Sequence, residues 1–224
     1  MPKVYLSPSN QTDNRYAYGN TTEAEQCGRI AEACRAALER SGVTVKLGHM
    51  PSMQEKVRES DAFGAELHVP IHTNAFNGKV TGTRMFCFNQ SGEGMKACKA
   101  IFARLAPLTP GTSENIRVDA SLYEVRAPKA PTAYIECEFH DNAEAAKWIV
   151  ENTELIGEAI AHGICDYFGV TYKPVEQPKP AQPEQPATDK LYRVQVGAFA
   201  VRENAEKMLR RLKDAGFEGY IREG

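Results

Sequence analysis

Residues 66–75 read Glu-Leu-His-Val-Pro-Ile-His-Thr-Asn-Ala, and residues 131–142 read Pro-Thr-Ala-Tyr-Ile-Glu-Cys-Glu-Phe-His-Asp-Asn. In both stretches a short apolar run suited to a buried strand leads directly into polar and charged side chains. Charges beside buried strand residues are costly unless they are paired or bound to a metal. Ligands of largely parallel sheets bind beyond the carboxyl ends of the strands. We therefore expect both stretches to be strands of one sheet that carry the functional site at their carboxyl ends.

Around these stretches, strand-like and helix-like segments alternate up to residue 168. Alternation of this kind predicts an α/β fold with a largely parallel sheet flanked by helices. Gly42 stands where a glycine is expected after the first long helix, and Asp141 with Glu144 resembles a capping box before the last one. The expected strands are 4–6, 43–47, 67–71, 84–88 and 133–135, and the expected helices are 22–41, 53–64, 92–106 and 142–168.

A proline-rich stretch, residues 173–189, separates this region from a short tail. Its prolines favour extended polyproline II, and it has too few apolar side chains to form a core, so we predict a linker. The sequence thus predicts a domain at 1–172 and a small βαβ fragment at 190–224. The tail holds eight Lys or Arg residues against five acidic residues, which also indicates a separate module.

Composition excludes two classes of partner. A formal net charge of −2 is unlike that of a strongly basic nucleic-acid-binding protein. No apolar run approaches the roughly 18 residues of a membrane span. The six cysteines form no CxxC pair, so we expect reduced, mostly buried thiols. The amino terminus has no signal-peptide pattern, and we expect synthesis in the cytoplasm.

The first stretch offers two histidines on one strand face, His68 and His72. Four strand residues span roughly 13 Å, so the two cannot share one metal ion. His72 stands at the strand terminus before polar residues and is the better ligand candidate, whereas we expect His68 to be a packed or hydrogen-bonded core histidine.

In the second stretch Glu136, Glu138 and His140 would share one face if the strand continues. A solvated strand-to-helix turn would explain Asp141 as a cap but not two acids directly after Ile135. The pattern therefore indicates a functional carboxylate near Glu136.

These motifs resemble those of the zinc-dependent N-acetylmuramoyl-L-alanine amidases called amidase 3, over about residues 2–168. His72-Thr-Asn74 is similar to the family's "IHxNA" zinc histidine, and Pro131 to Glu136 is similar to the segment that ends in its catalytic glutamate. Glu23, at the start of a helix, matches the glutamate ligand. The resemblance implies that Glu23 and His72 are ligands of Zn²⁺ and that Glu136 is the catalytic acid–base residue.

One position departs from the family. The first zinc histidine of its "DPGHGG" turn corresponds to Asn10 within Leu6-Ser-Pro-Ser-Asn-Gln11. A catalytic zinc normally has three protein ligands, so the third must come from His140, the amides of Asn10 or Gln11, or water.

The tail resembles the opening half of a SPOR domain, a module that binds peptidoglycan glycan strands, through its YRVQVGAF string and a helix ending near Gly216. A fragment this small buries little surface, so we expect it either to pair with a second copy or to be part of a longer domain.

The resemblance implies a peptidoglycan hydrolase that cleaves the amide between N-acetylmuramic acid and L-alanine with zinc-activated water. It would act at the cell wall, as an endolysin released by a holin or as an autolysin. Two rivals stay open: a non-catalytic wall-binding protein on a degenerate amidase fold, and a zinc peptidase that cuts within the stem peptide.

Overall fold

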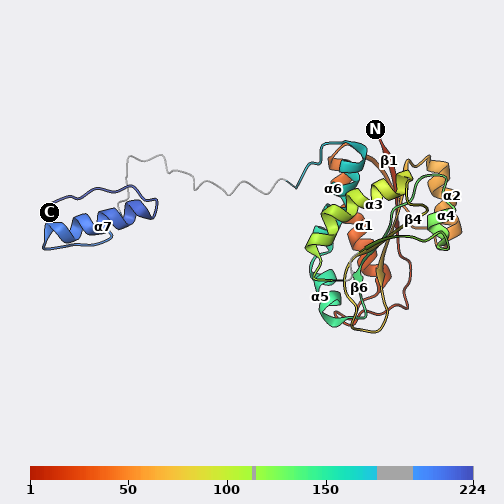
Figure 1. Cartoon of the computed structure of the whole chain (residues 1–224), viewed down its shortest axis with the longest axis horizontal. Helices are drawn as coiled ribbons and strands as arrows, with labels where there is room; N and C mark the ends of the chain where they lie inside the picture. The colour runs from red at the N-terminus through yellow and green to blue at the C-terminus, as the bar shows by residue number, and fades with distance from the viewer. Residues whose placement is uncertain (113–114, 176–193, 224) are drawn as a thin grey trace. The chain divides into compact units, whose positions relative to one another are not determined.

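The computed structural model describes residues 1–112, 115–175 and 194–223, in two compact units, 1–176 and 177–224 (Figure 1). The first unit contains a six-stranded sheet and its flanking helices. Its strands are β1 (Lys3–Pro8), β2 (Thr44–Leu47), β3 (Leu67–Asn74), β4 (Arg84–Cys87), β5 (Asn115–Val118) and β6 (Tyr134–Phe139). Its helices are α1 (Glu23–Arg40), α2 (Met53–Phe63), α3 (Glu93–Leu105), the 3₁₀ helix η1 (Ala106–Leu108), α4 (Tyr123–Arg126), α5 (Ala143–Glu151) and α6 (Thr153–Phe168).

The strand order is β2-β1-β3-β6-β4-β5. Every neighbouring pair is parallel except β4 and β6, which are antiparallel. The carboxyl ends of β1, β2, β3 and β6 therefore meet at one edge, and this arrangement confirms the predicted mostly parallel sheet. The four-residue strand β5, which has no buried residue, and the four-residue helix α4 were not predicted.

Helices α1, α3 and α6 pack on one face of the sheet, and α2 and α4 pack on the other (Figure 1). The first face forms the main core, where β-strand residues such as Leu6, Ile71 and Ile135 are fully buried. All six cysteines are buried and free, as predicted.

Two glycines let α6 approach its neighbours. A Cβ on Gly157 would lie 2.6 Å from the Cβ of Ala33 in α1, and a Cβ on Gly163 would lie 2.4 Å from the Cα of Ile101 in α3. Because backbone atoms cannot move away as a flexible side chain can, larger residues here would push the helices apart.

Two local predictions are corrected. The predicted helix 142–168 is two helices that meet at Asn152. Asn142, rather than Asp141, caps α5, since its Oδ1 accepts from the backbone N–H groups of Glu144 and Ala145. Asp141 instead accepts from the N–H groups of Phe76 and Gly78 and so anchors the loop after β3.

In the second unit the described residues contain one helix, α7 (Arg202–Asp214). The strands expected on both sides of it are not formed within 194–201 or 215–223, so the predicted βαβ arrangement is wrong for these residues. Most of the predicted linker lies outside the described residues. No described helix is both long and apolar enough to cross a membrane.

Candidate active site

Glu23 is held at the sheet edge by the start of α1. Thr22 is the N-cap: its Oγ1 accepts from the backbone N–H of Glu25, and the Glu25 carboxylate accepts from the N–H of Thr22. This reciprocal capping fixes the first turn and places Glu23 as its first residue. Only 1% of Glu23 is exposed, so its carboxylate is buried beside the helix N-terminus, where negative charge is favoured.

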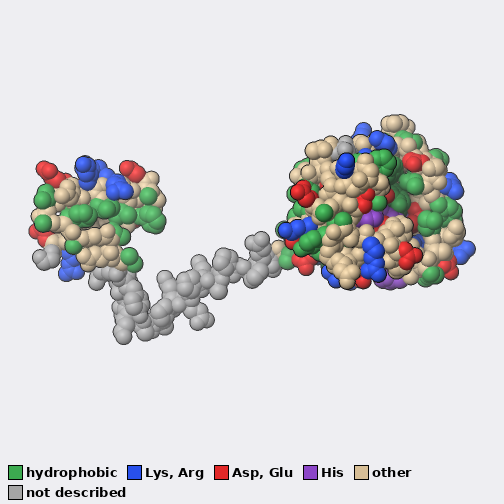
Figure 2. Space-filling model, turned by 90° about the horizontal axis from the view of Figure 1, so that it is seen from below, with side chains coloured by type: hydrophobic (Ala, Val, Ile, Leu, Met, Phe, Trp, Pro, Cys, Tyr) green, Lys and Arg blue, Asp and Glu red, His purple; other side chains and the backbone are tan. Residues whose placement is uncertain are grey.

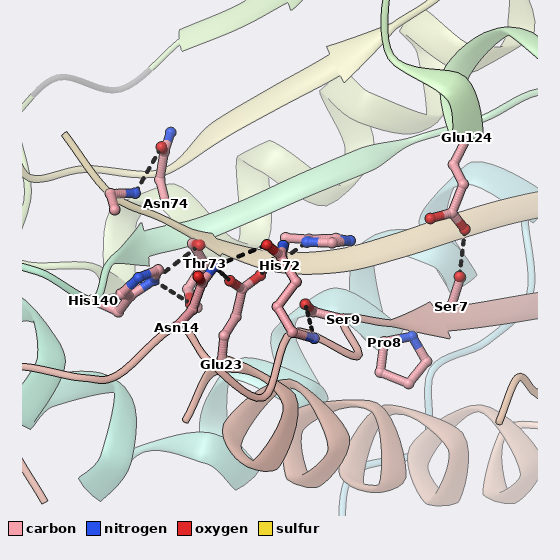
Figure 3. A network of polar contacts seen from close by, with 12 residues as sticks. Ser7, Pro8, Ser9, Asn14, Glu23, His72, Thr73, Asn74, Glu124 and His140 are labelled. Carbon is pink, nitrogen blue, oxygen red and sulfur yellow. Dashed lines mark hydrogen bonds and ion pairs between the residues drawn. The ribbon is translucent and has the colours of Figure 1, made fainter. Parts of the chain in front are cut away.

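Glu23 and His72 contact each other directly (Figure 3): His72 Nδ1 lies 2.9 Å from Glu23 Oε1. Asn14 donates to Glu23 Oε2 at 2.6 Å, and Gln11 Nε2 lies 3.4 Å from Glu23 Oε1. Burial opposes ionisation of Glu23, but the contacts with His72, Asn14 and Ser9 outweigh it and hold the pKa of Glu23 below its usual range. The carboxylate is therefore ionised at neutral pH.

Glu136 lies beside this pair. It is the register partner of His72 in the parallel β3–β6 ladder, so the two side chains share the sheet face that bears α2 and α4. Burial raises the pKa of Glu136 to about 7, with Glu23 adding to the rise and His72 and Arg84 opposing it. Glu136 Oε2 and His72 Nε2 are both buried and have no hydrogen-bond partner among the described residues. Two buried polar atoms without hydrogen-bond partners, on neighbouring strands and the same sheet face, indicate a site that binds a ligand.

His140 does not share the face of Glu136, contrary to the prediction. His72 pairs with Glu136 and Asn74 pairs with Phe139, so β6 carries one extra residue at a bulge, and alternation shifts after it. His140 Nδ1 lies 3.0 Å from both the hydroxyl and the carbonyl oxygen of Thr73, and its ring stacks on Tyr16. The imidazole is thus held on the side of β3 opposite His72.

The other two residues named as third-ligand candidates differ in position. Asn10 donates to the carbonyl oxygen of Pro51 and is turned away from Glu23. Gln11 contacts Glu23, and its own oxygen accepts from Asn14. Among the described residues, no three His, Cys, Asp or Glu side chains are grouped to hold a metal. Of the three candidates, only Gln11 has a hydrogen bond to Glu23 among the described residues.

Glu138 has a different role from Glu136. It is fully buried, and its Oε2 accepts from the backbone N–H groups of Gly82 at 2.6 Å and of Phe139 at 2.9 Å. Gly82 has φ of 110° and ends the loop between β3 and β4. Glu138 therefore ties that loop to β6.

A second carboxylate–imidazole pair was not predicted. His68 Nε2 lies 3.2 Å from Glu124 Oε1, and Ser7 donates to the same oxygen. His68 Nδ1 contacts the Ser60 hydroxyl at 3.0 Å, and the ring stacks on Tyr5. Burial opposes ionisation of Glu124, but His68, Ser7 and Lys56 hold its pKa below the usual range. Polar residues alternating with apolar ones in β1 and β3 were the only available signal for this cluster.

The structure is similar to solved amidases. It matches AmiC2 of Nostoc punctiforme, an N-acetylmuramoyl-L-alanine amidase, with TM-score 0.67 and 19% identity over 75% of this chain and 97% of that chain. It also matches the catalytic domain of CwlV from Bacillus (Paenibacillus) polymyxa var. colistinus, with TM-score 0.67 and 18% identity over 76% of this chain and 100% of that one.

Sequence comparisons agree. The sporulation-specific N-acetylmuramoyl-L-alanine amidase of Bacillus subtilis (strain 168) is 20% identical over 230 residues, which cover 99% of this chain and 84% of that protein. A SPOR domain model matches residues 176–223. The model of the N-acetylmuramoyl-L-alanine amidase family matches residues 4–166, which contain all of the sheet except Lys3 and include Glu23, His72 and Glu136. The chain therefore belongs to the N-acetylmuramoyl-L-alanine amidase family and is a peptidoglycan amidase.

Proposed function

We propose that this amidase cleaves the bond between N-acetylmuramic acid and L-alanine with a zinc ion held by Glu23 and His72 and with Glu136 as the acid–base residue. The observation that carries the proposal is that Glu136 lies opposite His72 in the β3–β6 ladder, on the same sheet face, while His72 contacts Glu23. Two of their buried polar atoms, His72 Nε2 and Glu136 Oε2, have no partner among the described residues.

The residues fit a zinc ion. An ionised carboxylate and an imidazole in contact are donors of the kind that zinc prefers. Two such donors are one fewer than a catalytic zinc usually has, and we propose Gln11 as the third. Its amide nitrogen donates to Glu23, and rotation of the amide would turn its oxygen, which accepts from Asn14, toward the same place. An amide is a weaker zinc donor than the histidine of other family members, so we expect weaker metal binding.

The chemistry divides between the metal and the protein. A zinc ion supplies Lewis-acid polarisation of the scissile carbonyl and of a water molecule. Glu136 takes a proton from the attacking water molecule while the oxygen of that water bonds to the carbonyl carbon. Glu136 then gives that proton to the alanine nitrogen as the carbon–nitrogen bond breaks. A pKa of about 7 lets one carboxyl group accept and return the proton at neutral pH.

The substitution Glu136→Gln tests the proposal. It keeps the size of the side chain but removes the proton carrier, so the variant should fold, bind zinc and lose about a hundredfold or more in kcat. Hydrolysis of a soluble muropeptide is measured by the release of N-terminal L-alanine. Release of an internal amino group instead would show a stem-peptide endopeptidase, and normal activity of the variant would remove Glu136 from the mechanism.

We further propose that residues 1–172 are the catalytic domain, 173–189 a linker and 190–224 a tail that binds glycan strands. Hydrophobic side chains lie on the surface of the described tail (Figure 2). They include Val194, which is 89% exposed, Phe217 at 65% and Tyr220 at 71%. Helix α7 buries none of its residues. These surfaces support pairing of the tail with the wall or, in a homodimer, with a second copy of itself.

Deleting residues 174–224 separates these roles. Activity on soluble muropeptides should stay unchanged, because the cluster of Glu23, His72 and Glu136 lies within residues 1–172. Activity on intact sacculi should fall by about 10²-fold, since a tethered binding module raises the local substrate concentration. Equal losses on both substrates would show that the tail belongs to the catalytic fold, and sedimentation of the full chain as a monomer would exclude the homodimer.

A further inference from the structure

Tyr134 lies beside the proposed catalytic residues but is used neither to bind the metal nor to transfer the proton. It stands two residues before Glu136 in β6, so their side chains share one sheet face. Its ring stacks on His72 with centroids 4.8 Å apart and planes 17° apart. It also meets Phe86, its cross-strand partner in β4, edge to face at 6.1 Å. The phenol ring is therefore fixed from both neighbouring strands.

The hydroxyl of Tyr134 is free while its ring is buried. The residue is 9% exposed, and no hydrogen bond to its hydroxyl is formed within the described part of the chain. The oxygen is also not among the enclosed atoms that lack partners, so the exposed part of the residue includes the hydroxyl.

The other two buried tyrosines differ from Tyr134. The hydroxyl of Tyr5 bonds to Glu59 at 2.7 Å, and that of Tyr16 bonds to Thr73 at 2.9 Å. Buried tyrosines usually find such a partner. Tyr134 instead presents an unused donor on the face that carries His72 and Glu136.

We propose that Tyr134 is a catalytic residue whose hydroxyl donates a hydrogen bond to the carbonyl oxygen of the scissile amide as that oxygen gains negative charge. As the water oxygen bonds to the carbonyl carbon, the π electron pair moves onto the carbonyl oxygen. Glu136 takes the water proton and delivers it to the leaving nitrogen, while Tyr134 keeps its own proton throughout. This inference rests on the proposed roles of His72 and Glu136.

The physical basis is preorganisation. A donor whose ring is already fixed by His72 and Phe86 needs no reorganisation when charge develops on the substrate. Removing one such donor from an enzyme costs about 10²- to 10³-fold in kcat. The donor acts on the transition state rather than on the neutral amide, so its loss should leave KM nearly unchanged.

The test is Tyr134→Phe, which removes the hydroxyl and keeps both ring contacts. The matched control is Tyr5→Phe, the same change on the same sheet face at a hydroxyl that is already bonded. On a soluble muropeptide, Tyr134→Phe should lower kcat about 10²-fold with KM and bound zinc unchanged, and Tyr5→Phe should keep kcat. Tyr134→Phe should also weaken binding of a phosphinate analogue of the tetrahedral state, by a similar factor.

Three results would overturn the inference. The first is an unchanged kcat in Tyr134→Phe while Glu136→Gln is inactive, which leaves the proposed function intact. The second is a loss confined to KM or accompanied by loss of zinc, which would show a binding or positioning role. The third is unchanged affinity for the phosphinate. An active Glu136→Gln variant, by contrast, would overturn the proposed function itself.

Discussion

Strand β3 contributes a histidine to each of two carboxylate–imidazole pairs, His68 with Glu124 and His72 with Glu23. The pairs differ in whether the second nitrogen of the imidazole has a hydrogen-bond partner. His68 Nε2 and Glu124 Oε1 lie 3.2 Å apart, and His72 Nδ1 and Glu23 Oε1 lie 2.9 Å apart. Figure 3 shows Glu23 beside His72 and Glu124 beside Ser7. The second ring nitrogen of His68 contacts Ser60, whereas that of His72 has no partner among the described residues. His68 is fully enclosed, and His72, at the strand end, is 8% exposed.

The comparison shows that the same pair of groups can serve stability or chemistry. Where every polar atom is satisfied, a buried pair fastens elements together, in this case α2 and α4 to the sheet. Where an atom is left without a partner at the open end of a strand, the pair can take a ligand. Alanine substitution of each histidine separates the two roles.

The largest effect is expected for His68→Ala. Removing the fully enclosed imidazole leaves a cavity and takes one hydrogen-bond partner each from Glu124 and Ser60, and changes of this kind cost about 2–5 kcal/mol in the free energy of unfolding. His72→Ala should cost less, because His72 lies partly exposed near the strand end and one of its ring nitrogens already has no partner among the described residues. Its hydrolytic activity should be lost. Urea unfolding followed by circular dichroism gives the stabilities, and muropeptide hydrolysis gives the activities.

The comparison fails if the two variants lose the same stability, or if folded His68→Ala protein is inactive. Hydrolysis should therefore be measured without urea, at a temperature at which circular dichroism shows that the His68→Ala variant is folded.

The family pattern identified Glu23 and His72. His68 was correctly expected to be a hydrogen-bonded core histidine, but its partner Glu124 was not predicted. His72 and Glu136 could be named because in each stretch an apolar strand runs directly into polar residues, whereas Glu23 was named only through the resemblance to the amidase family. Glu124 is far from His68 in sequence, and no local pattern indicates that α4 brings them together. The bulge in β6 could not be predicted either, because one extra residue changes the sheet face of His140 without changing the apolar pattern.

A smaller effect is expected from the pH dependence of the stability that the pair of His68 and Glu124 provides. The folded-state pKa of Glu124 lies below its ordinary value of 4.5, so its ionised form contributes stability that is fully present above that value. This contribution is lost as pH falls through the lower folded pKa. In Glu124→Gln the contribution is absent at every pH.

The difference in unfolding free energy between wild type and Glu124→Gln should therefore be largest near pH 7 and shrink as the solution is acidified below pH 4.5. Subtracting the variant removes the similar contribution of Glu23, whose pKa is also lowered. A difference that stays constant down to acid unfolding would show that Glu124 acts through packing rather than through its charge.

The smallest effect is expected on zinc affinity, when the proposed third donor beside Glu23 and His72 is changed. Gln11 contacts Glu23, whereas Asn10 bonds to Pro51 and His140 to Thr73. Gln11→Ala should weaken zinc binding about 10- to 100-fold, the range found when groups supporting a metal site are removed. Asn10→Ala is the matched control from the same turn and should bind zinc as wild type does. His140→Ala should lower stability through lost contacts with Thr73 and Tyr16 but leave zinc affinity unchanged.

Competition with a zinc chelator measures all three affinities without relying on activity. Gln11→Glu sharpens the result, because a carboxylate is a better zinc donor than an amide and should bind the ion more tightly than wild type does. Unchanged affinity in Gln11→Ala would leave water as the third donor. A loss of zinc affinity in His140→Ala alone would mean that His140 leaves Thr73 to bind the metal. The metal site of His72 and Glu23 would then also include a residue from the opposite face of β3.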